Sequence, residues 1–245
     1  MTRSSDVLSR IRPLDLIFFR GTDLVSHTIR ECQRHHAKSH CYDCSLVPSH
    51  IGIVVNRELL PHVTCMKSSK LYLLESTITY GYVTSTSRIL DGVDNGVQLR
   101  ELKRALDVYC NPPLTAYDKF CATVRACPPS AYWAPLINNP YKTREARKTM
   151  IRLYDLLMSQ PYDLTFVQQL GSTFKCMRGL SRSITANSHC IFCSQLIAII
   201  LDQLDICKFR DCSCVCPLDF IHMRCKGQRV IERPMRISTD TFIQV

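Results

Sequence analysis

The sequence predicts an α+β fold in which an antiparallel sheet packs against one amphipathic helix. Three apolar runs, at residues 51–55, 70–75 and 96–100, have the β-branched and aliphatic composition of buried strands, with turn-forming residues between them. Residues 190–204 instead repeat apolar side chains every three or four positions, which is typical of a helix. Successive strands joined by short connections usually pair antiparallel, so we expect an antiparallel sheet.

The elements that flank these strands follow from the same patterns. Residues 15–20 indicate a first strand, and residues 23–34 have helical apolar spacing. A polar stretch rich in His and Cys follows at residues 32–47 and is interpreted as a loop. Near the C-terminus we expect a turn at residues 217–220 and a last short strand at residues 229–232.

The middle of the chain is interpreted as helical and divided by prolines. Helix-like apolar spacing recurs at residues 115–126 and 143–159. We therefore treat residues 1–245 as a single domain that carries insertions at about residues 31–47 and 103–159.

Composition narrows the class of protein. Apolar residues make up 46% of the chain, enough for a large core, whereas no apolar run reaches the roughly 18 residues that a membrane span needs. Residues 1–12 lack the apolar segment of a signal peptide, so we expect a cytoplasmic protein. Its fifteen cysteines are then expected to be mostly reduced thiols rather than a disulfide scaffold.

The net charge of +10 points to an acidic partner or an anionic membrane surface. The basic residues are spread along the chain and are not accompanied by an aromatic RNA-binding signature. Nucleic acid is therefore not the expected partner.

Cys193 is the candidate nucleophile. It stands at the predicted start of the clearest helix, where free backbone N–H groups and the helix dipole favour a thiolate and can also stabilise an oxyanion. Most cysteines in such a helix are simply buried, so position alone does not assign the role. A thiol also needs a base to be ionised efficiently at neutral pH.

His50 is the candidate base, because it precedes a rigid buried strand and can project into a cleft. Glu75 ends the next predicted strand, and a carboxylate there can accept the second imidazole N–H and fix the tautomer. Two other histidines compete with His50. His27 falls within a helical pattern, and His189 lies four residues before Cys193.

Six short blocks occur in an order that resembles a known enzyme superfamily. They are RPLDLIFFRG at residues 12–21, SHIGIVV at 49–55, LLES at 73–76, GVQLR at 96–100, PYD at 161–163 and FCSQLIA at 192–198. The set is similar to the NlpC-type papain-like cysteine hydrolases, in the circularly permuted branch where the histidine precedes the cysteine. That branch includes relatives of lecithin–retinol acyltransferase, bacterial lipoproteins and proteins of poxviruses and other large DNA viruses.

The resemblance implies a papain-like fold with Cys193 as nucleophile, His50 as base and Glu75 as the third polar residue. It also implies that Tyr162 lies near the active site. The branch often has Glu where this chain has Gln195, which removes a charge close to the nucleophile. The implied reaction is hydrolysis or transfer at an amide or ester bond, without a cofactor, on a peptide or lipid acyl substrate. A viral member would act in the host cytoplasm or the virion.

Rival interpretations belong to other functional classes. The chain can instead be a catalytically idle binding protein that keeps the cleft, or a zinc-stabilised, basic nucleic-acid or virion structural protein. One group of residues has spacing compatible with a structural zinc site: Cys32, His36, Cys41 and Cys44. The alternative without a metal is an exposed, His-rich loop with reduced thiols. A second group of Cys207, Cys212, Cys214, Cys216 and Cys225 is compatible with zinc or a disulfide. The Cys190–Cys193 spacing resembles a redox motif, but the thioredoxin-like pattern around it is missing.

Overall fold

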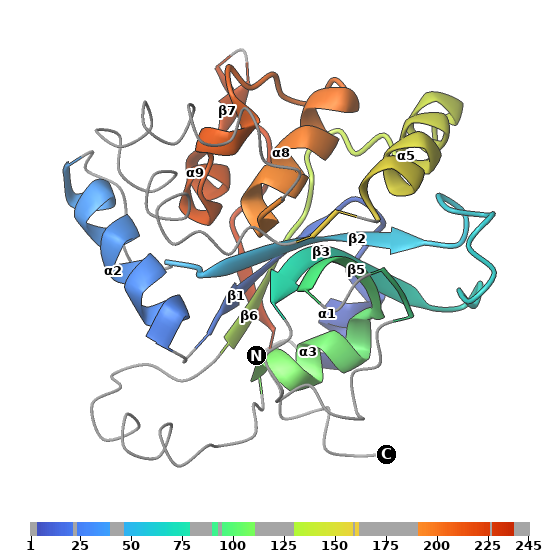
Figure 1. Ribbon diagram of the computed structural model, residues 1–245, viewed down its shortest axis with the longest axis horizontal. Coiled ribbons are helices and arrows are strands. Elements are labelled where there is room, and N and C mark those ends of the chain that lie inside the picture. Colours follow the sequence, from blue (N-terminus) through green and yellow to red (C-terminus); the bar gives the residue numbers. More distant parts are fainter. Residues whose placement is uncertain are drawn as a thin grey trace.

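The computed structural model describes most of the chain. The described residues are 4–21, 24–39, 47–78, 90–92, 95–110, 130–158, 160–161, 191–225 and 227–237. They form a mixed α+β structure with an antiparallel sheet (Figure 1), so the predicted fold class is confirmed at this level. No helix among these residues is long and apolar enough to cross a membrane.

The main sheet has seven strands in the order β4-β5-β3-β2-β1-β6-β9, and its neighbours pair antiparallel. The strands are β1 (Leu16–Arg20), β2 (His50–Asn56), β3 (Leu71–Ile78), β4 (Asp91–Gly92), β5 (Asn95–Glu101), β6 (Ser130–Ala134) and β9 (Met235–Ile237). A separate hairpin joins β7 (Arg224–Cys225) to β8 (Gln228–Arg229).

Helices cover both faces of this sheet (Figure 1). On one face lie α5 (Arg144–Leu157), α8 (Cys193–Gln203) and α9 (Pro217–His222), and on the other lie α1 (Ser4–Arg10) and α3 (Leu102–Cys110). A further helix, α2 (Leu24–Ser39), follows β1, and residues Cys212–Cys214 form a short 3-10 helix.

Strand alternation divides the core into two layers. Along β2, Ile51, Ile53 and Val55 pack with the apolar side of α8, whereas Val54 packs with the apolar side of α3. Successive strand side chains point to opposite faces, so each strand contributes to both layers. Each fully buried aliphatic side chain contributes about 2 kcal/mol through removal from water.

A buried carboxylate ties the beginning of β1 to the end of β6. Asp15 is fully buried and accepts hydrogen bonds from the backbone N–H of Arg12 and Leu136, at 2.9 and 3.0 Å. It also accepts from the Trp133 indole at 2.9 Å and the Asn139 amide at 3.1 Å. These four donors satisfy a buried charge that would otherwise be costly. Asp15, which belongs to the first sequence block, therefore has a structural role.

Four sequence-based expectations are wrong in detail. Residues 32–39 continue α2 instead of belonging to a loop, residues 217–222 form α9 instead of a turn, and the last strand is β9 instead of residues 229–232. The fourth error is β6, which lies inside the interval interpreted as purely helical and pairs with both β1 and β9. The strand is difficult to predict from the sequence, because it is only five residues long and has prolines close to both ends.

Candidate active site

Cys193 is the first residue of α8, as the sequence predicts. Phe192 caps the helix in an extended conformation, and the first intrahelical bond runs from the Leu196 N–H to the Phe192 carbonyl at 3.0 Å. Backbone N–H groups in the first turn of a helix precede the intrahelical ladder and favour negative charge nearby. The Cys193 side chain is 5% exposed and belongs to the core layer shared by α8 and the sheet.

Hydrogen bonds from two serines fix the start of α8 against the rest of the fold. Ser76 on β3 donates its hydroxyl to the Ile191 carbonyl, two residues before Cys193. Ser194 donates to the Val215 carbonyl at 2.7 Å. Both hydroxyls are buried, so the start of α8 is held to β3 on one side and to the segment between the 3-10 helix and α9 on the other.

His50 links α8 to the sheet. It is the first residue of β2, and it lies close enough to Cys193 for the charge and hydrogen bonding of that thiol to raise the pKa of the His50 ring. Its Nε2 atom lies 2.7 Å from Oε2 of Glu75. Since Nε2 is occupied by the carboxylate, Nδ1 is the nitrogen left to face the sulfur. Cys193, His50 and Glu75 therefore form one continuous chain of side-chain contacts.

Glu75 is a fully buried carboxylate whose oxygens contact three polar side chains. Its Oε1 forms an ion pair with Arg100 Nε at 3.4 Å, and its Oε2 accepts from His50 and from the Tyr109 hydroxyl, the latter at 3.0 Å. Burial alone would raise the pKa of Glu75, but Arg100, followed by His50 and Tyr109, lowers it below its ordinary value. Glu75 is thus ionised at neutral pH.

Arg100 is held in turn by its own strand. It is 1% exposed, and its Nε donates to Gln98 Oε1 at 2.7 Å. Gln98 is the direct cross-strand partner of Glu75 in the pairing of β5 with β3. A buried guanidinium requires such hydrogen-bonded partners, and here they fix it behind the carboxylate.

An aromatic stack braces the imidazole. Tyr109, at the end of α3, stacks on Phe19 with ring centroids 4.0 Å apart and on His50 at 5.4 Å. Phe19 is also the cross-strand partner of His50 between β1 and β2. The stack restricts rotation of the imidazole while its nitrogens keep their polar partners.

The surroundings of His50 favour the protonated ring. Burial lowers its pKa, but the charge and hydrogen bond of Cys193, followed by those of Glu75, outweigh burial and raise the pKa from 6.5 to about 10. The imidazole is thereby suited to hold a proton taken from a thiol. Other described thiols lie in different surroundings, since burial raises the pKa of Cys110, Cys207 and Cys212 to about 11.

The structure brings together three of the four proposed active-site residues, namely Cys193, His50 and Glu75. Glu75 lies inside β3, which extends to Ile78, rather than at the end of its strand. The fourth residue, Tyr162, lies outside the described residues, as does His189. His27 is an exposed residue of α2.

Three further residues of the cluster were missed at the sequence level: Gln98, Arg100 and Tyr109. Gln98 and Arg100 belong to a sequence block noted above, and alternation along that strand puts them on one face. That face is the one that carries Glu75. Tyr109 has no sequence signal, because its role depends on which sheet face α3 covers.

The proposed zinc ligands stay a prediction. Cys32 and His36 fall on α2, but their side chains lie outside the described part, and Cys41 and Cys44 lie wholly outside it. Among the described residues, no group of three or more His, Cys, Asp or Glu side chains converges as metal ligands would.

Chemically, the cluster combines a thiol, a base that can receive its proton, and a carboxylate that orients the base. This is the arrangement that nucleophilic acyl transfer requires. Neither a protein-family model nor a curated protein matches this chain. The contacts among Cys193, His50 and Glu75 are therefore the observations that carry a functional proposal.

Proposed function

We propose that the chain is a cysteine hydrolase that cleaves or transfers an acyl group through a thioester, with a papain-like fold of the permuted NlpC type. One observation carries this proposal: the unbroken chain of contacts from the Cys193 thiol through the His50 imidazole to the Glu75 carboxylate. The position of Cys193 at the first turn of α8 supports it, because the same backbone N–H groups can bind an oxyanion.

In the proposed reaction, the proton of the Cys193 thiol passes to His50 before the attack, and the resulting thiolate sulfur attacks the carbonyl carbon of an amide or ester. The carbonyl π pair moves to oxygen, which backbone N–H at the start of α8 stabilises. Collapse of this intermediate breaks the bond to the leaving group, and His50 returns its proton to the departing amine or alcohol.

Deacylation repeats these steps with water as the attacking group. His50 accepts a proton from water, the new oxygen–carbon bond forms, and the thioester carbon–sulfur bond breaks to release a carboxylic acid. An alcohol or amine in place of water gives acyl transfer. No metal or cofactor is required by this scheme.

Glu75 supports both steps from its position behind the imidazole. Its carboxylate accepts the Nε2–H, which keeps Nδ1 directed at sulfur and stabilises the imidazolium. Arg100 and Tyr109 hold Glu75 in place and contact no reacting atom, so they are positioning residues.

The substrate is an acyl compound, either a peptide or amide or a lipid ester. The net charge of +10 favours an acidic substrate or action at an anionic membrane surface over a neutral one. We infer a cytoplasmic site of action, where free thiols such as those of the described cysteines persist.

Trapping the acyl-enzyme tests the proposal. The protein is incubated with activated esters and peptide amides, and intact mass spectrometry follows an acyl adduct that hydroxylamine removes. We expect the adduct on Cys193, with product release, and its loss in Cys193→Ala. Cys65→Ala is the matched control because Cys65 is an exposed thiol, and this variant should keep full activity.

Two outcomes distinguish the rival functions. An adduct that persists unchanged in Cys193→Ala would overturn the assignment of the nucleophile. Failure of folded wild-type protein to form an adduct or release product with any ester or amide would favour an idle binding or virion structural protein. Comparison of lipid esters with peptide amides then assigns the substrate class of an active enzyme.

A further inference from the structure

A pair of thiols lies near the C-terminal end of α8, the end opposite to the one that carries Cys193. Cys207 follows the C-terminal end of α8 and is 6% exposed, and Cys225 ends β7 and is partly exposed. The two side chains are neighbours, because Cys225 is, after burial, the main group that raises the pKa of Cys207, and both are free thiols. Both also belong to the core layer that α8 shares with the sheet.

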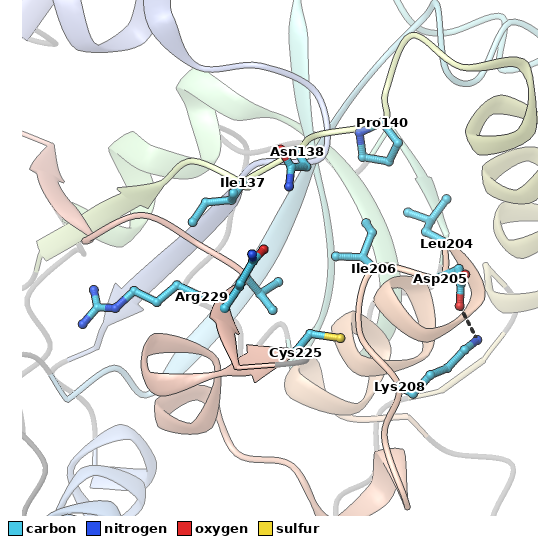
Figure 2. A pocket seen from close by; sticks show the side chains of 11 residues that line it. Ile137, Asn138, Pro140, Leu204, Asp205, Ile206, Lys208, Cys225 and Arg229 are labelled. Carbon is cyan, nitrogen blue, oxygen red and sulfur yellow. Dashed lines mark ion pairs between the residues drawn. The ribbon is translucent and has the colours of Figure 1, made fainter.

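One of these thiols lines a pocket. The pocket has a volume of about 360 Å³ and lies between residues 137–140, the segment after α8 and the β7–β8 hairpin (Figure 2). Cys225 is part of its wall, with its sulfur directed toward the segment that carries Ile206 and Lys208 (Figure 2). A reagent of a few atoms can therefore reach Cys225, whereas Cys207 is buried and does not line the pocket.

The surroundings favour dithiol chemistry over metal binding. A zinc site needs three or four ligands, and no such group of His, Cys, Asp or Glu converges among the described residues. Two neighbouring thiols, one of them accessible, are instead the arrangement from which a disulfide forms.

We propose that Cys207 and Cys225 are an oxidisable dithiol, which a peroxide entering the pocket converts into a disulfide between α8 and the β7–β8 hairpin. This modification site is independent of the acyl chemistry proposed for Cys193.

The reaction proceeds in two balanced steps. The Cys225 thiolate attacks one oxygen of hydrogen peroxide, the O–O bond breaks, and protonation of the leaving hydroxide gives water and a sulfenic acid. The Cys207 sulfur then attacks the oxidised sulfur, loses its proton, and expels the hydroxyl group as a second water. Two electrons pass from the two thiols to one peroxide.

The environment of Cys207 keeps it from being the thiol that reacts first with peroxide. Burial, followed by the neighbouring Cys225 and Asp202, raises the pKa of Cys207 to about 11, so at neutral pH it stays a thiol. It is thus protected from direct oxidation, and it neighbours the sulfur that is oxidised first, which it attacks as it loses its proton. The product ties the end of α8 to the hairpin.

Peptide mapping of the oxidised native protein tests the pairing. A protease that cleaves before aspartate isolates Cys207 in residues 205–210 and Cys225 in residues 219–239, each without another cysteine. Native protein is treated with one equivalent of hydrogen peroxide, remaining thiols are blocked, and the digest is analysed without reduction. We expect these two peptides to be joined, with a mass two hydrogens below their sum.

Matched variants separate this pair from other thiols of the region. Cys207→Ser and Cys225→Ser should each abolish the linked species, whereas Cys212→Ser, which removes a partly buried thiol of the same region, should retain it. Formation of the bond should raise the Tm by roughly 5 °C, because it closes a loop in the unfolded chain. Protein oxidised in denaturant serves as the scrambled reference.

Two results would overturn the inference. One is the absence of the 205–210 to 219–239 link in oxidised native wild type. The other is its formation in native protein at no more than the level found in the scrambled reference. Neither result depends on a variant that must fold, because both are measured on the wild-type chain.

Discussion

Nε2 of His50 lies 2.7 Å from Oε2 of Glu75, and this contact joins two neighbouring strands of the sheet through their side chains. The other carboxylate oxygen of Glu75 is paired with Arg100 at 3.4 Å. Arg100 therefore holds one oxygen of the carboxylate, and the other oxygen is the fixed partner of the His50 imidazole. That leaves Nδ1 as the ring nitrogen available to Cys193.

Glu75→Gln tests the carboxylate behind the imidazole. The amide keeps the size of the side chain but loses the charge that stabilises the imidazolium, and it can present N–H instead of oxygen to Nε2. We expect kcat to fall by roughly 10²–10⁴-fold, the range of a general-acid–base contribution. Steady-state kinetics on the substrate found by acyl trapping measure this loss. Activity within about twofold of wild type would remove Glu75 from the proposal.

Tyr109→Phe separates the hydroxyl from the ring. The variant keeps the stacks on Phe19 and His50 but loses the hydrogen bond to Glu75. A single hydrogen bond to a charged group contributes about 1.5–3 kcal/mol, so we expect kcat to fall by roughly 10-fold or more. The matched variant Tyr109→Leu also loses the stack and should fall further. Equal kinetics for Tyr109→Phe and wild type would show that the hydroxyl does not position Glu75.

Arg100→Met tests the buried ion pair through stability. Removal of the guanidinium leaves a buried carboxylate with too few partners, which should lower the free energy of unfolding by about 3–5 kcal/mol at pH 7. Lys70→Met is the control, because Lys70 pairs with Glu101, the neighbour of Arg100 on β5, at a more exposed site. Loss of this exposed ion pair should lower the free energy of unfolding by about 0–1 kcal/mol. Urea unfolding of the three proteins measures both.

The pH dependence of the Arg100→Met effect has a definite sign. The folded protein lowers the pKa of Glu75, so this group adds stability above its unfolded pKa of about 4.3, and the gain is lost as pH falls through the lower folded value. The difference between wild type and Arg100→Met should therefore be largest at neutral pH and shrink below about pH 4.3. A difference that grows in acid would contradict an ionised Glu75.

The raised pKa of His50 predicts the alkaline limit of activity. Protonated His50 is the general acid for the leaving group, so activity should persist above pH 7 and decline only as pH approaches about 10. In Glu75→Gln the limit should move to lower pH, because the Glu75 charge and hydrogen bond both raise the pKa of His50. The profile of kcat/KM against pH measures this shift, and a wild-type limit near 6.5 would contradict it.

The sequence predicted the parts of the site that depend on local pattern. Cys193 at the start of a helix and His50 at the entrance of a strand follow from apolar periodicity, which local composition determines. Glu75 was selected through the order of the sequence blocks. Their convergence required the resemblance, since no local rule states which strand lies beside which helix.

The parts that were missed depend on long-range packing. Tyr109 reaches Glu75 only because α3 covers the sheet face opposite α8, and sequence spacing does not specify that choice. β6 pairs with β1 across more than a hundred residues of chain, and its flanking prolines resemble those of a loop. The continuation of α2 to Ser39 overrides a polar composition that favoured a loop.

The reactivity of Cys193 toward iodoacetamide in the native protein tests the central claim most directly. Alkylation of Cys193 and of exposed Cys65 is followed in one sample by peptide mass spectrometry at pH 7, for wild type and for His50→Gln. The account predicts that Cys193 reacts at least roughly tenfold faster than Cys65, and that His50→Gln removes this advantage while Cys65 is unchanged. A Cys193 rate that is the same with and without His50 would contradict it.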